Sequence, residues 1–437
     1  MRIIHVKFML DIKFIRENPD VVRANLEKRG NTENLMMLDE LVALDKQWRL
    51  NLTHLNDLRH ARKTVTVEIA KLKKAGQDTQ TQFKKAKDID VKITSIEKQV
   101  AHEAEREHIL LLRLPNMLDP TVPLGGDESD NVQVKTWGTI PVFNFKVKNH
   151  IDLANELDII DMERAGKVSG ARFFFLKNQL VLLDLALMSF AMHELSKKGY
   201  VAIEPPYMLN KTAYEGVTAL ADFVDVLYKI EGEDLYMIAT SEHPMAAMYM
   251  NEVIEKQNLP LKFAGLSTCF RKEAGVHGKD TRGIFRTHQF NKIEQFIFCK
   301  PEDSVKLHEE LLANAEDLLQ KLELPYRVVN VCTGDIGTVA AKKYDIEVWM
   351  PAQNGYRELV SCSNFTDYQA RRLGIRYREK AGAPPKGFLH TLNSTAIATG
   401  RMLVALLENN QNEDGSINVP QVLRKYVGGF EKIDKNR

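Results

Sequence analysis

Residues 268–294 read TCFRKEAGVHGKDTRGIFRTHQFNKIE. The segment begins like a strand, continues into a loop rich in glycine and positive charge, and returns to a strand-like pattern from Thr287. The pattern predicts a β-hairpin whose cations converge: Arg271, Lys272, Lys279, Arg282 and Arg286. Arginine forks bind phosphate oxygens in pairs, so this hairpin could hold a polyphosphate. The alternative is a solvated hairpin that binds nothing.

The chain around this hairpin, from about residue 150 onward, mixes helical and strand-like patterns. Apolar periodicity predicts helices over 178–198 and 303–322. Strands are predicted at Leu235–Ile238, Ile293–Phe298, Tyr326–Val331 and Asp345–Met350. Their long, irregular connections favour an α+β domain with a mostly antiparallel β-sheet flanked by helices. Neither GxGxxG nor GxxxxGKS/T occurs, so the sequence indicates no Rossmann or P-loop nucleotide site.

The first 115 residues have a different pattern. Apolar residues between Leu38 and Leu72 recur at gaps of three, four and seven, with an interruption near Arg59 and Arg62. A second such run extends from Ile89 to Ala104, and the polar breaker 75–78 separates the two. This pattern predicts an antiparallel coiled-coil hairpin, an arm of two helices of about 35 residues each.

The outer half of this predicted arm is basic. From residue 59 to residue 87 there are nine Lys or Arg residues against Glu68 and Asp78. Charge concentrated near the end of an arm is suited to a phosphate backbone. The alternative is an ordinary solvated face. The candidate phosphate-binding cations are Arg59, Arg62, Lys63, Lys71, Lys73, Lys74, Lys84 and Lys85.

The overall composition sets limits on function. The 437 residues include 60 Lys or Arg and 59 Asp or Glu, a formal net charge of +1, and 44% are hydrophobic. These values are typical of a soluble globular protein, since a disordered chain has fewer apolar residues. A protein that coats nucleic acid non-specifically has a large basic excess, so that class is disfavoured.

The cysteines and the hydropathy pattern indicate a location. Successive cysteines lie 30, 33 and 30 residues apart, a spacing that suits neither a disulfide framework nor a zinc knuckle. No run of 18 apolar residues and no secretory signal pattern occurs. We therefore expect a cytoplasmic protein with reduced thiols and no membrane partner.

Two further segments carry candidate chemistry. In YRELVSCSN, residues 356–364, Glu358 and Ser361 are hard oxygen donors of the kind that magnesium binds together with substrate phosphates. The alternative is a helix cap or turn. In LNSTAIATGR, residues 392–401, Gly400-Arg401 precedes an apolar helix. Arg401 could stack on an aromatic base and face a phosphate, or it could be a surface cation at a helix end.

In this order, the segments resemble the motifs of class II aminoacyl-tRNA synthetases, and most of all those of the seryl-tRNA synthetase family. GYVAIEPP resembles motif 1 (about 190–208), the hairpin motif 2 (about 265–296), and LNSTAIATGR with ALLEN motif 3 (about 390–411). ATSEHP, residues 239–244, resembles the family's serine-binding TxE loop. Ser241 in that loop and the LNSTAIATGR form resemble the archaeal and eukaryotic cytosolic branch. The resemblance runs from about Met9, an alternative first residue, to the end.

The resemblance implies a domain division, an activity and partners. Residues 1–115 would form an N-terminal tRNA-binding domain with the arm, and residues 116–437 the class II catalytic domain. The implied activity joins L-serine and ATP into seryl-adenylate and transfers serine to the 3′ end of tRNA(Ser), with tRNA(Sec) as a further candidate. Mg²⁺ would accompany ATP, and a homodimer would form through motif 1. No zinc is expected, because no cysteine set replaces the amino-binding residues.

The resemblance also implies residue roles. Arg271 would hold the ATP α-phosphate and the serine carboxylate, and Phe290 and Arg401 would enclose the adenine. Glu358 and Ser361 would bind Mg²⁺ and nucleotide, so that the implied catalytic residues are Arg271, Glu358 and Arg401. Further ATP contacts would come from Lys272, Glu273, Arg286, Thr287, Leu359 and Val360. The serine contacts would come from Thr240, Ser241, Glu242, Arg271, Glu294, Asn393 and Thr395.

Two alternatives differ from this interpretation. The first is a related ligase that loads an amino acid onto a carrier protein, but that relative lacks the coiled-coil arm. The second is an inactive paralogue that serves as a binding partner. Intact Arg271, Glu294 and Arg401, together with Glu358, argue against the second alternative.

Overall fold

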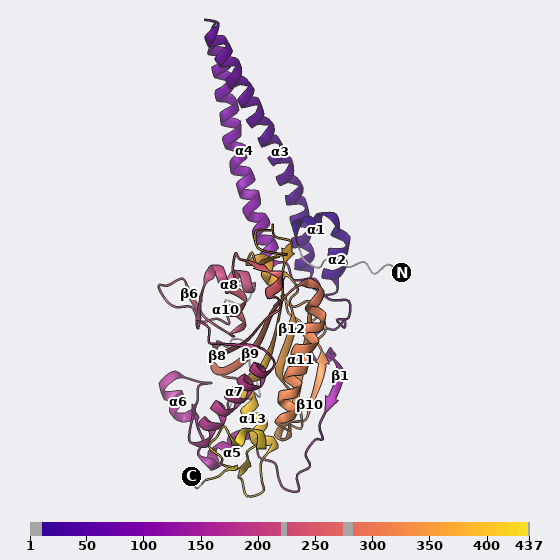
Figure 1. Ribbon diagram of the computed structural model, residues 1–437, viewed down its shortest axis with the longest axis vertical. Helices are drawn as coiled ribbons and strands as arrows, with labels where there is room; N and C mark the ends of the chain where they lie inside the picture. The colour runs from indigo at the N-terminus through magenta and orange to yellow at the C-terminus, as the bar shows by residue number, and fades with distance from the viewer. Residues whose placement is uncertain (1–10, 220–224, 274–282, 436–437) are drawn as a thin grey trace. The chain divides into compact units, whose positions relative to one another are not determined.

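The computed structural model describes residues 11–219, 225–273 and 283–435. The loop cations Lys279 and Arg282, which the sequence places in the hairpin, lie outside these ranges. The chain divides into two compact units, Met9–Met117 and Leu118–Arg437. Figure 1 shows the helices of the first unit and the sheet of the second.

The N-terminal unit contains the predicted arm. Its helices are α1 (Ile12–Glu17), α2 (Pro19–Glu27), α3 (Thr32–Lys74) and α4 (Gln80–Arg113). α3 and α4 run antiparallel beside each other, as Figure 1 shows. α3 is longer than about 35 residues because it begins at Thr32, where the Asn31 side chain accepts a hydrogen bond from the Glu33 amide at 2.9 Å and caps the helix.

The arm is held by a short apolar seam and by ion pairs. Leu55 and Val65 are buried, and Val65 packs with Ala86 and Ile89 of α4. The predicted seam is interrupted at two arginines, and ion pairs to α4 replace apolar contacts there: Arg59 with Glu97 at 2.8 Å and Arg62 with Asp90 at 2.7 Å. Such solvent-exposed pairs add little to stability, but they fix which turns of the two helices meet.

The second unit is built on an eight-stranded sheet, ordered β1-β10-β11-β12-β15-β9-β8-β4. All neighbouring pairs are antiparallel except β4 with β8, so the predicted α+β class with a mostly antiparallel sheet is confirmed. The strands are β1 (Val132–Trp137), β10 (Tyr326–Asn330), β11 (Lys342–Met350), β12 (Gly355–Asn364), β15 (His390–Ala398), β9 (Gln289–Cys299), β8 (Leu261–Phe270) and β4 (Val201–Ile203).

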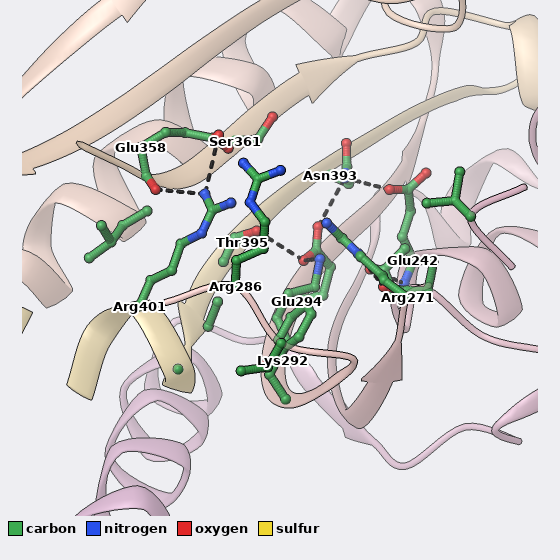
Figure 2. A pocket seen from close by; sticks show the side chains of 18 of the residues that line it. Glu242, Arg271, Arg286, Lys292, Glu294, Glu358, Ser361, Asn393, Thr395 and Arg401 are labelled. Carbon is green, nitrogen blue, oxygen red and sulfur yellow. Dashed lines mark hydrogen bonds and ion pairs between the residues drawn. The ribbon is translucent and has the colours of Figure 1, made fainter. Parts of the chain in front are cut away.

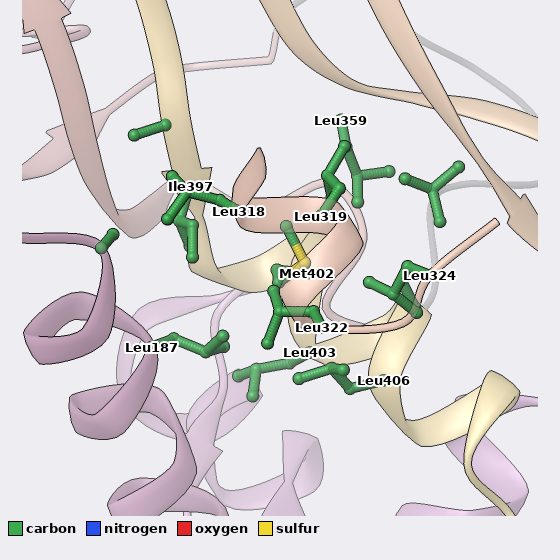
Figure 3. Packing of buried hydrophobic residues seen from close by; sticks show 14 of the residues in the cluster. Leu187, Leu318, Leu319, Leu322, Leu324, Leu359, Ile397, Met402, Leu403 and Leu406 are labelled. Carbon is green, nitrogen blue, oxygen red and sulfur yellow. The ribbon is translucent and has the colours of Figure 1, made fainter. Parts of the chain in front are cut away.

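Three helices cover one face of this sheet: α7 (Gln179–Lys197), α11 (Ser304–Lys321) and α13 (Thr399–Asn409). Figure 3 shows Leu187 of α7, Leu318 of α11 and Leu403 of α13 meeting in the core beneath β15. Because side chains alternate along a strand, Ile293 and Ile297 of β9 point into this core, whereas Glu294 and Phe296 face the other side. That other side carries the candidate site.

Shorter elements surround the sheet. The shorter α-helices of the second unit, among the described residues, are α5 (His150–Leu157), α6 (Met162–Ser169), α8 (Lys211–Val217), α10 (Glu242–Ala247), α12 (Tyr368–Arg372) and α14 (Gln421–Arg424). The small sheets contain β2 (Ile160–Asp161) with β3 (Phe175–Leu176), β5 (Met208–Asn210) with β6 (Leu235–Met237), β7 (Val253–Glu255) with β13 (Arg376–Arg378) and β14 (Gly387–Phe388), and β16 (Ile417–Asn418) with β17 (Lys432–Ile433).

Candidate active site

A cavity of about 410 Å³ opens on the face of the sheet opposite α7, α11 and α13. Figure 2 shows side chains from the strands, the α10 segment and α13 pointing into it. Of the residues implied by the resemblance, those that line the cavity are Thr240, Glu242, Arg271, Glu273, Arg286, Thr287, Phe290, Glu294, Glu358, Leu359, Ser361, Asn393, Thr395 and Arg401. Segments that lie more than 150 residues apart in the sequence thus share one site.

One end of the cavity is a buried carboxylate cluster on β9 and β15. Glu294, which is fully buried, is paired with Thr395 across the two strands, so both side chains face the cavity. The Thr395 hydroxyl donates to Glu294 Oε2 at 3.3 Å, and Lys292 Nζ lies 2.5 Å from that oxygen. Asn393 Nδ2 donates to Glu294 Oε1 at 2.9 Å. The cluster offers a polar, mostly acidic surface that suits a small hydroxylated, cationic ligand.

Glu242 faces this cluster from the first turn of α10. Its Oε2 accepts a hydrogen bond from Asn393 at 2.7 Å, and its amide donates to Thr240 Oγ1 at 3.2 Å. Burial and the neighbouring Glu294 carboxylate raise the pKa of Glu242 to about 7, against the opposing effect of the Lys292 cation. An ammonium group placed here would favour the ionised carboxylate.

A glycine allows the Thr240–Glu242 segment to lie directly on the sheet. A Cβ at Gly265 of β8 would fall 2.9 Å from Ser241 Oγ and 2.8 Å from Met245 Sδ. Ser241 Oγ instead donates to the Gly265 carbonyl at 3.1 Å. This contact anchors the segment next to Glu294, the cross-strand partner of Gly265.

Arg271 lies immediately after the end of β8. Its Nε donates to the Ala239 carbonyl at 3.2 Å, and its guanidinium lies 5.2 Å from the centre of the Phe290 ring. The amide of Arg271 donates to the His288 carbonyl at 2.9 Å, which continues the hairpin beyond the strand. The guanidinium is therefore held from two sides, with its Nη atoms left to face an anion.

The other end of the cavity contains Glu358, Ser361 and Arg401. Residues three apart on a regular strand point to opposite faces, but Glu358 pairs with Glu347 while Val360 pairs with Ile346. Leu359 is thus an extra residue, a β-bulge that turns Glu358 toward the face of Ser361. The helix cap or turn considered from the sequence is not what forms, because both residues lie on β12.

Arg401 connects α13 to this end. Its Nη1 donates to the Glu358 carbonyl at 2.7 Å and to Glu358 Oε2 at 3.2 Å, as Figure 2 shows. The guanidinium lies 5.1 Å from the centre of the Phe285 ring. Gly400 makes this approach possible, because a Cβ there would lie 2.9 Å from the Ile284 carbonyl oxygen.

The oxygen donors of β12 fit a magnesium ion that arrives with a nucleotide. Glu358 and Ser361 supply one carboxylate and one hydroxyl, and magnesium takes its other ligands from phosphates and water. Asp345, the cross-strand partner of Ser361, is buried, and its Oδ1 has no hydrogen-bond partner among the described residues. In those residues no group of three or more His, Cys, Asp or Glu side chains is arranged to hold a metal ion by itself.

Three residues implied by the resemblance lie outside the cavity lining. Ser241 is fully buried and bonds to Gly265. Val360 is fully buried in the core on the helical side of the sheet, because the bulge reverses its direction. Lys272 is exposed, and its Nζ lies 5.9 Å from the centre of the Tyr228 ring. Substrate contact by these three residues stays a prediction.

The cavity also includes residues that the sequence did not single out. Lys292 lies between Phe290 and Glu294, and strict alternation along β9 would have placed all three on one face. Lys343 lies 3.3 Å from Asp345 on β11, and no local pattern marks it. Phe285, which contacts Arg401, lies within the 268–294 segment, but no feature of that segment distinguishes it from other apolar residues.

The predicted cations of the arm fall into two groups. Arg59 and Arg62 form ion pairs between α3 and α4, and Lys73 Nζ lies 5.4 Å from the Phe83 ring centre. The other five are exposed on the helices: Lys63, Lys71, Lys74, Lys84 and Lys85. The exposed lysines, together with Lys87, form the basic surface that could contact a phosphate backbone.

Comparison with known proteins agrees with this geometry. Residues 227–410 match the family described as the tRNA synthetase class II core domain (G, H, P, S and T). Residues 9–118 match the seryl-tRNA synthetase N-terminal domain. The fold and the site therefore define a class II aminoacyl-tRNA synthetase.

Individual relatives narrow the assignment. The serine–tRNA ligase of Methanocella arvoryzae is 56% identical over 97% of this chain and 100% of its own length. A crystal structure of the Pyrococcus horikoshii seryl-tRNA synthetase complexed with ATP is 49% identical, with a TM-score of 0.93, and covers 98% of this chain and 99% of its own. A crystal structure of the Naegleria fowleri cytoplasmic serine–tRNA ligase in complex with AMP is 36% identical, with a TM-score of 0.89. The match covers 98% of this chain and 99% of the other. The chain belongs to the seryl-tRNA synthetase family.

Proposed function

We propose that the chain activates L-serine with ATP to seryl-adenylate and then transfers serine to the 3′ end of tRNA(Ser). One observation carries this proposal: a single cavity holds Arg271 together with a buried carboxylate cluster and the Glu358–Arg401 pair. The first group suits the charges of an amino acid, and the second suits those of a nucleotide. Serine-dependent exchange of pyrophosphate into ATP tests it.

In the proposed first step, the serine carboxylate attacks the α-phosphorus of ATP, and the bond to pyrophosphate breaks. Arg271 offsets the repulsion between the two anions and aligns them. The Arg401 guanidinium offsets the negative charge of the phosphates and stacks on one face of the adenine ring, and the Phe290 ring stacks on the other face. Magnesium, held by Glu358 and Ser361, would neutralise phosphate charge. In the second step a terminal tRNA hydroxyl attacks the carbonyl carbon, and AMP leaves.

The acid cluster provides the proposed selectivity for serine. Glu242 would take the ammonium group with Thr240, while Glu294 and Thr395 would pair with the side-chain hydroxyl. Alanine lacks that hydroxyl and would leave buried polar groups without partners, a mismatch that can reduce reaction by a factor of about 10⁴. Threonine retains the hydroxyl and would be excluded by its extra methyl group.

Serine activation is expected to weaken as the pH falls, because Glu242 must be ionised to attract an ammonium group. The pKa of Glu242 is raised to about 7, so protons compete with serine below that pH. At saturating ATP, kcat/KM for serine should fall about tenfold for each pH unit below about 7. The Glu242→Gln variant should have a low kcat/KM for serine that does not fall further at acidic pH. A wild-type profile that stays flat down to about pH 5.5 would contradict this role for Glu242.

We further propose a homodimer through motif 1. Apolar side chains are exposed on α7 and β4: Leu185 is 52% exposed and Val201 57% exposed. Among the described helices, α7 is long and apolar enough to cross a membrane, yet more than half of it is buried within the protein. A second copy of the chain would cover the remainder, and β4 is an edge strand that invites such pairing. Light scattering of the wild type should give a molar mass of two chains, and the Leu185→Asp variant should give the mass of a single chain.

Two finer points belong to the same proposal. The cytoplasm is the proposed location, because all four cysteines are buried and unpaired. The arm's basic surface is proposed to bind tRNA(Ser), and tRNA(Sec) is a second candidate acceptor. Charging both transcripts under one set of conditions distinguishes an enzyme for one acceptor from an enzyme for both.

A further inference from the structure

One buried amide touches the carboxylate cluster from outside the cavity. Gln369, on α12, is fully buried and does not line the cavity. Its Nε2 donates to Glu242 Oε1 at 3.0 Å and to the Val217 carbonyl oxygen at 3.2 Å. None of the residue roles implied by the family resemblance falls on this glutamine.

Gln369 completes a clamp on Glu242. Asn393 donates to Oε2 and Gln369 donates to Oε1, so each carboxylate oxygen accepts one amide hydrogen. The two donors come from different elements, β15 and α12, and together they fix the position and the plane of the carboxylate. Hydrogen bonds to an ionised acceptor are also stronger than those to a neutral one, so the clamp favours the charged form.

The second hydrogen bond of Gln369 keeps its donor in place. The contact with the Val217 carbonyl ties the amide to the end of α8, so Nε2 cannot rotate away from Glu242 without leaving a buried acceptor unpaired. An amide donor also adds no charge. A lysine at this position would neutralise Glu242 and compete with any ammonium group in the cavity.

We propose that Gln369 is a positioning residue for recognition of the substrate's ammonium group, which acts by holding the Glu242 carboxylate toward the cavity. The inference rests on the proposed function, in which Glu242 receives that group. The inference gives α12 a role in amino-acid specificity, although Gln369 does not itself line the cavity.

The first test is Gln369→Met, which keeps the side-chain length and removes the donor. In pyrophosphate exchange, KM for serine should rise about tenfold, the equivalent of one hydrogen bond to a charged group. KM for ATP and kcat should stay within about twofold, because Gln369 contacts neither nucleotide nor reacting atoms. The control variant is Gln320→Met on α11, which makes the same substitution away from the cavity. It removes a 2.8 Å hydrogen bond to the Tyr326 hydroxyl and should leave KM for serine unchanged.

A pair of ligands separates positioning from a general loss of structure. One is adenosine linked through a sulfamoyl group to L-serine, and the other is the same compound without the amino group. Calorimetry should show that the wild type prefers the amino compound, and that Gln369→Met reduces this preference about tenfold while affinity for the des-amino compound is retained. Equal weakening of both compounds, or no change in their ratio, would overturn the inference.

The outcomes distinguish this inference from the proposed function. If the wild type shows no serine-dependent exchange, the proposed function fails first. If the wild type activates serine and Gln369→Met keeps its preference for the amino compound, only the role of Gln369 fails. Should Gln369→Met not fold, Gln369→Asn, which is one methylene too short to reach both acceptors, decides the question with the same two ligands.

Discussion

Replacing Arg271 with alanine is expected to reduce kcat/KM for serine-dependent pyrophosphate exchange by about 10³-fold or more, with little loss of stability. Removal of a single preorganised charge-stabilising donor typically costs about 10²–10³ in rate. Arg271 is proposed to contact both reacting anions, so its loss removes attraction and alignment together. Arg271→Lys should recover only part of the activity, because an ammonium group cannot form a two-pronged contact.

The position of Arg271 explains why the effect should be catalytic. The side chain is anchored by Ala239 and by the Phe290 ring, and it closes no apolar core. Arg327 offers a matched control, because its guanidinium is also held by one hydrogen-bonded acceptor, Glu347, and lies 5.1 Å from the Tyr356 ring centre. Arg327→Ala should therefore lose similar contacts but keep its exchange activity. Near-normal exchange by a folded Arg271→Ala variant would remove Arg271 from the proposed mechanism.

Shortening the arm is expected to separate the two steps of the reaction. Residues 55–99 can be replaced with a four-residue turn, which keeps the ion pair of Glu40 with Arg106 at 2.6 Å and the hydrogen bond from Asn51 to Glu103 at 2.7 Å. The shortened protein should activate serine at the normal rate. Its kcat/KM for charging of tRNA(Ser) should fall roughly thousandfold, since the exposed lysines that would meet phosphates are gone.

A second variant isolates the contribution of charge from that of length. Changing Lys63, Lys71, Lys74, Lys84 and Lys85 to glutamine leaves α3 and α4 intact, since these side chains are exposed. We expect weaker tRNA binding and a smaller dependence of affinity on salt, because fewer counterions are released. If the shortened protein charges tRNA(Ser) normally, or if the lysine variant keeps the wild-type salt dependence, the arm does not bind tRNA as proposed.

Much of the fold could be predicted because it follows from local periodicity. α7 and α11 begin and end within one residue of the predicted 178–198 and 303–322. Their apolar stripes are long, and such stripes are the most readable signal of a helix in a sequence. β11 begins earlier than the predicted Asp345, because its first residues, Lys342 to Tyr344, lack the apolar run that marks a buried strand. Of these, Lys343 lines the cavity.

The site was only partly predictable, for a physical reason. Arg271, Glu294 and Arg401 lie in dense runs of charged and glycine-containing sequence, so their chemistry was visible. The bulge at Leu359 was not, because it arises from register with β11 and not from any residue type in β12. Gln369 depends on where α12 packs relative to α10, a tertiary relation that no spacing in the sequence encodes. The net charge of +1 similarly concealed the basic surface of the arm.

The most direct test of the central claim is ATP–pyrophosphate exchange by the purified, folded full-length chain with magnesium and single amino acids. Robust exchange is expected with L-serine, and exchange with alanine should be lower by about 10⁴-fold because the hydroxyl-binding groups stay unpaired. Exchange with threonine should also be low. Absence of serine-dependent exchange, or equal exchange with serine and alanine, would contradict the assignment of this cavity to serine activation.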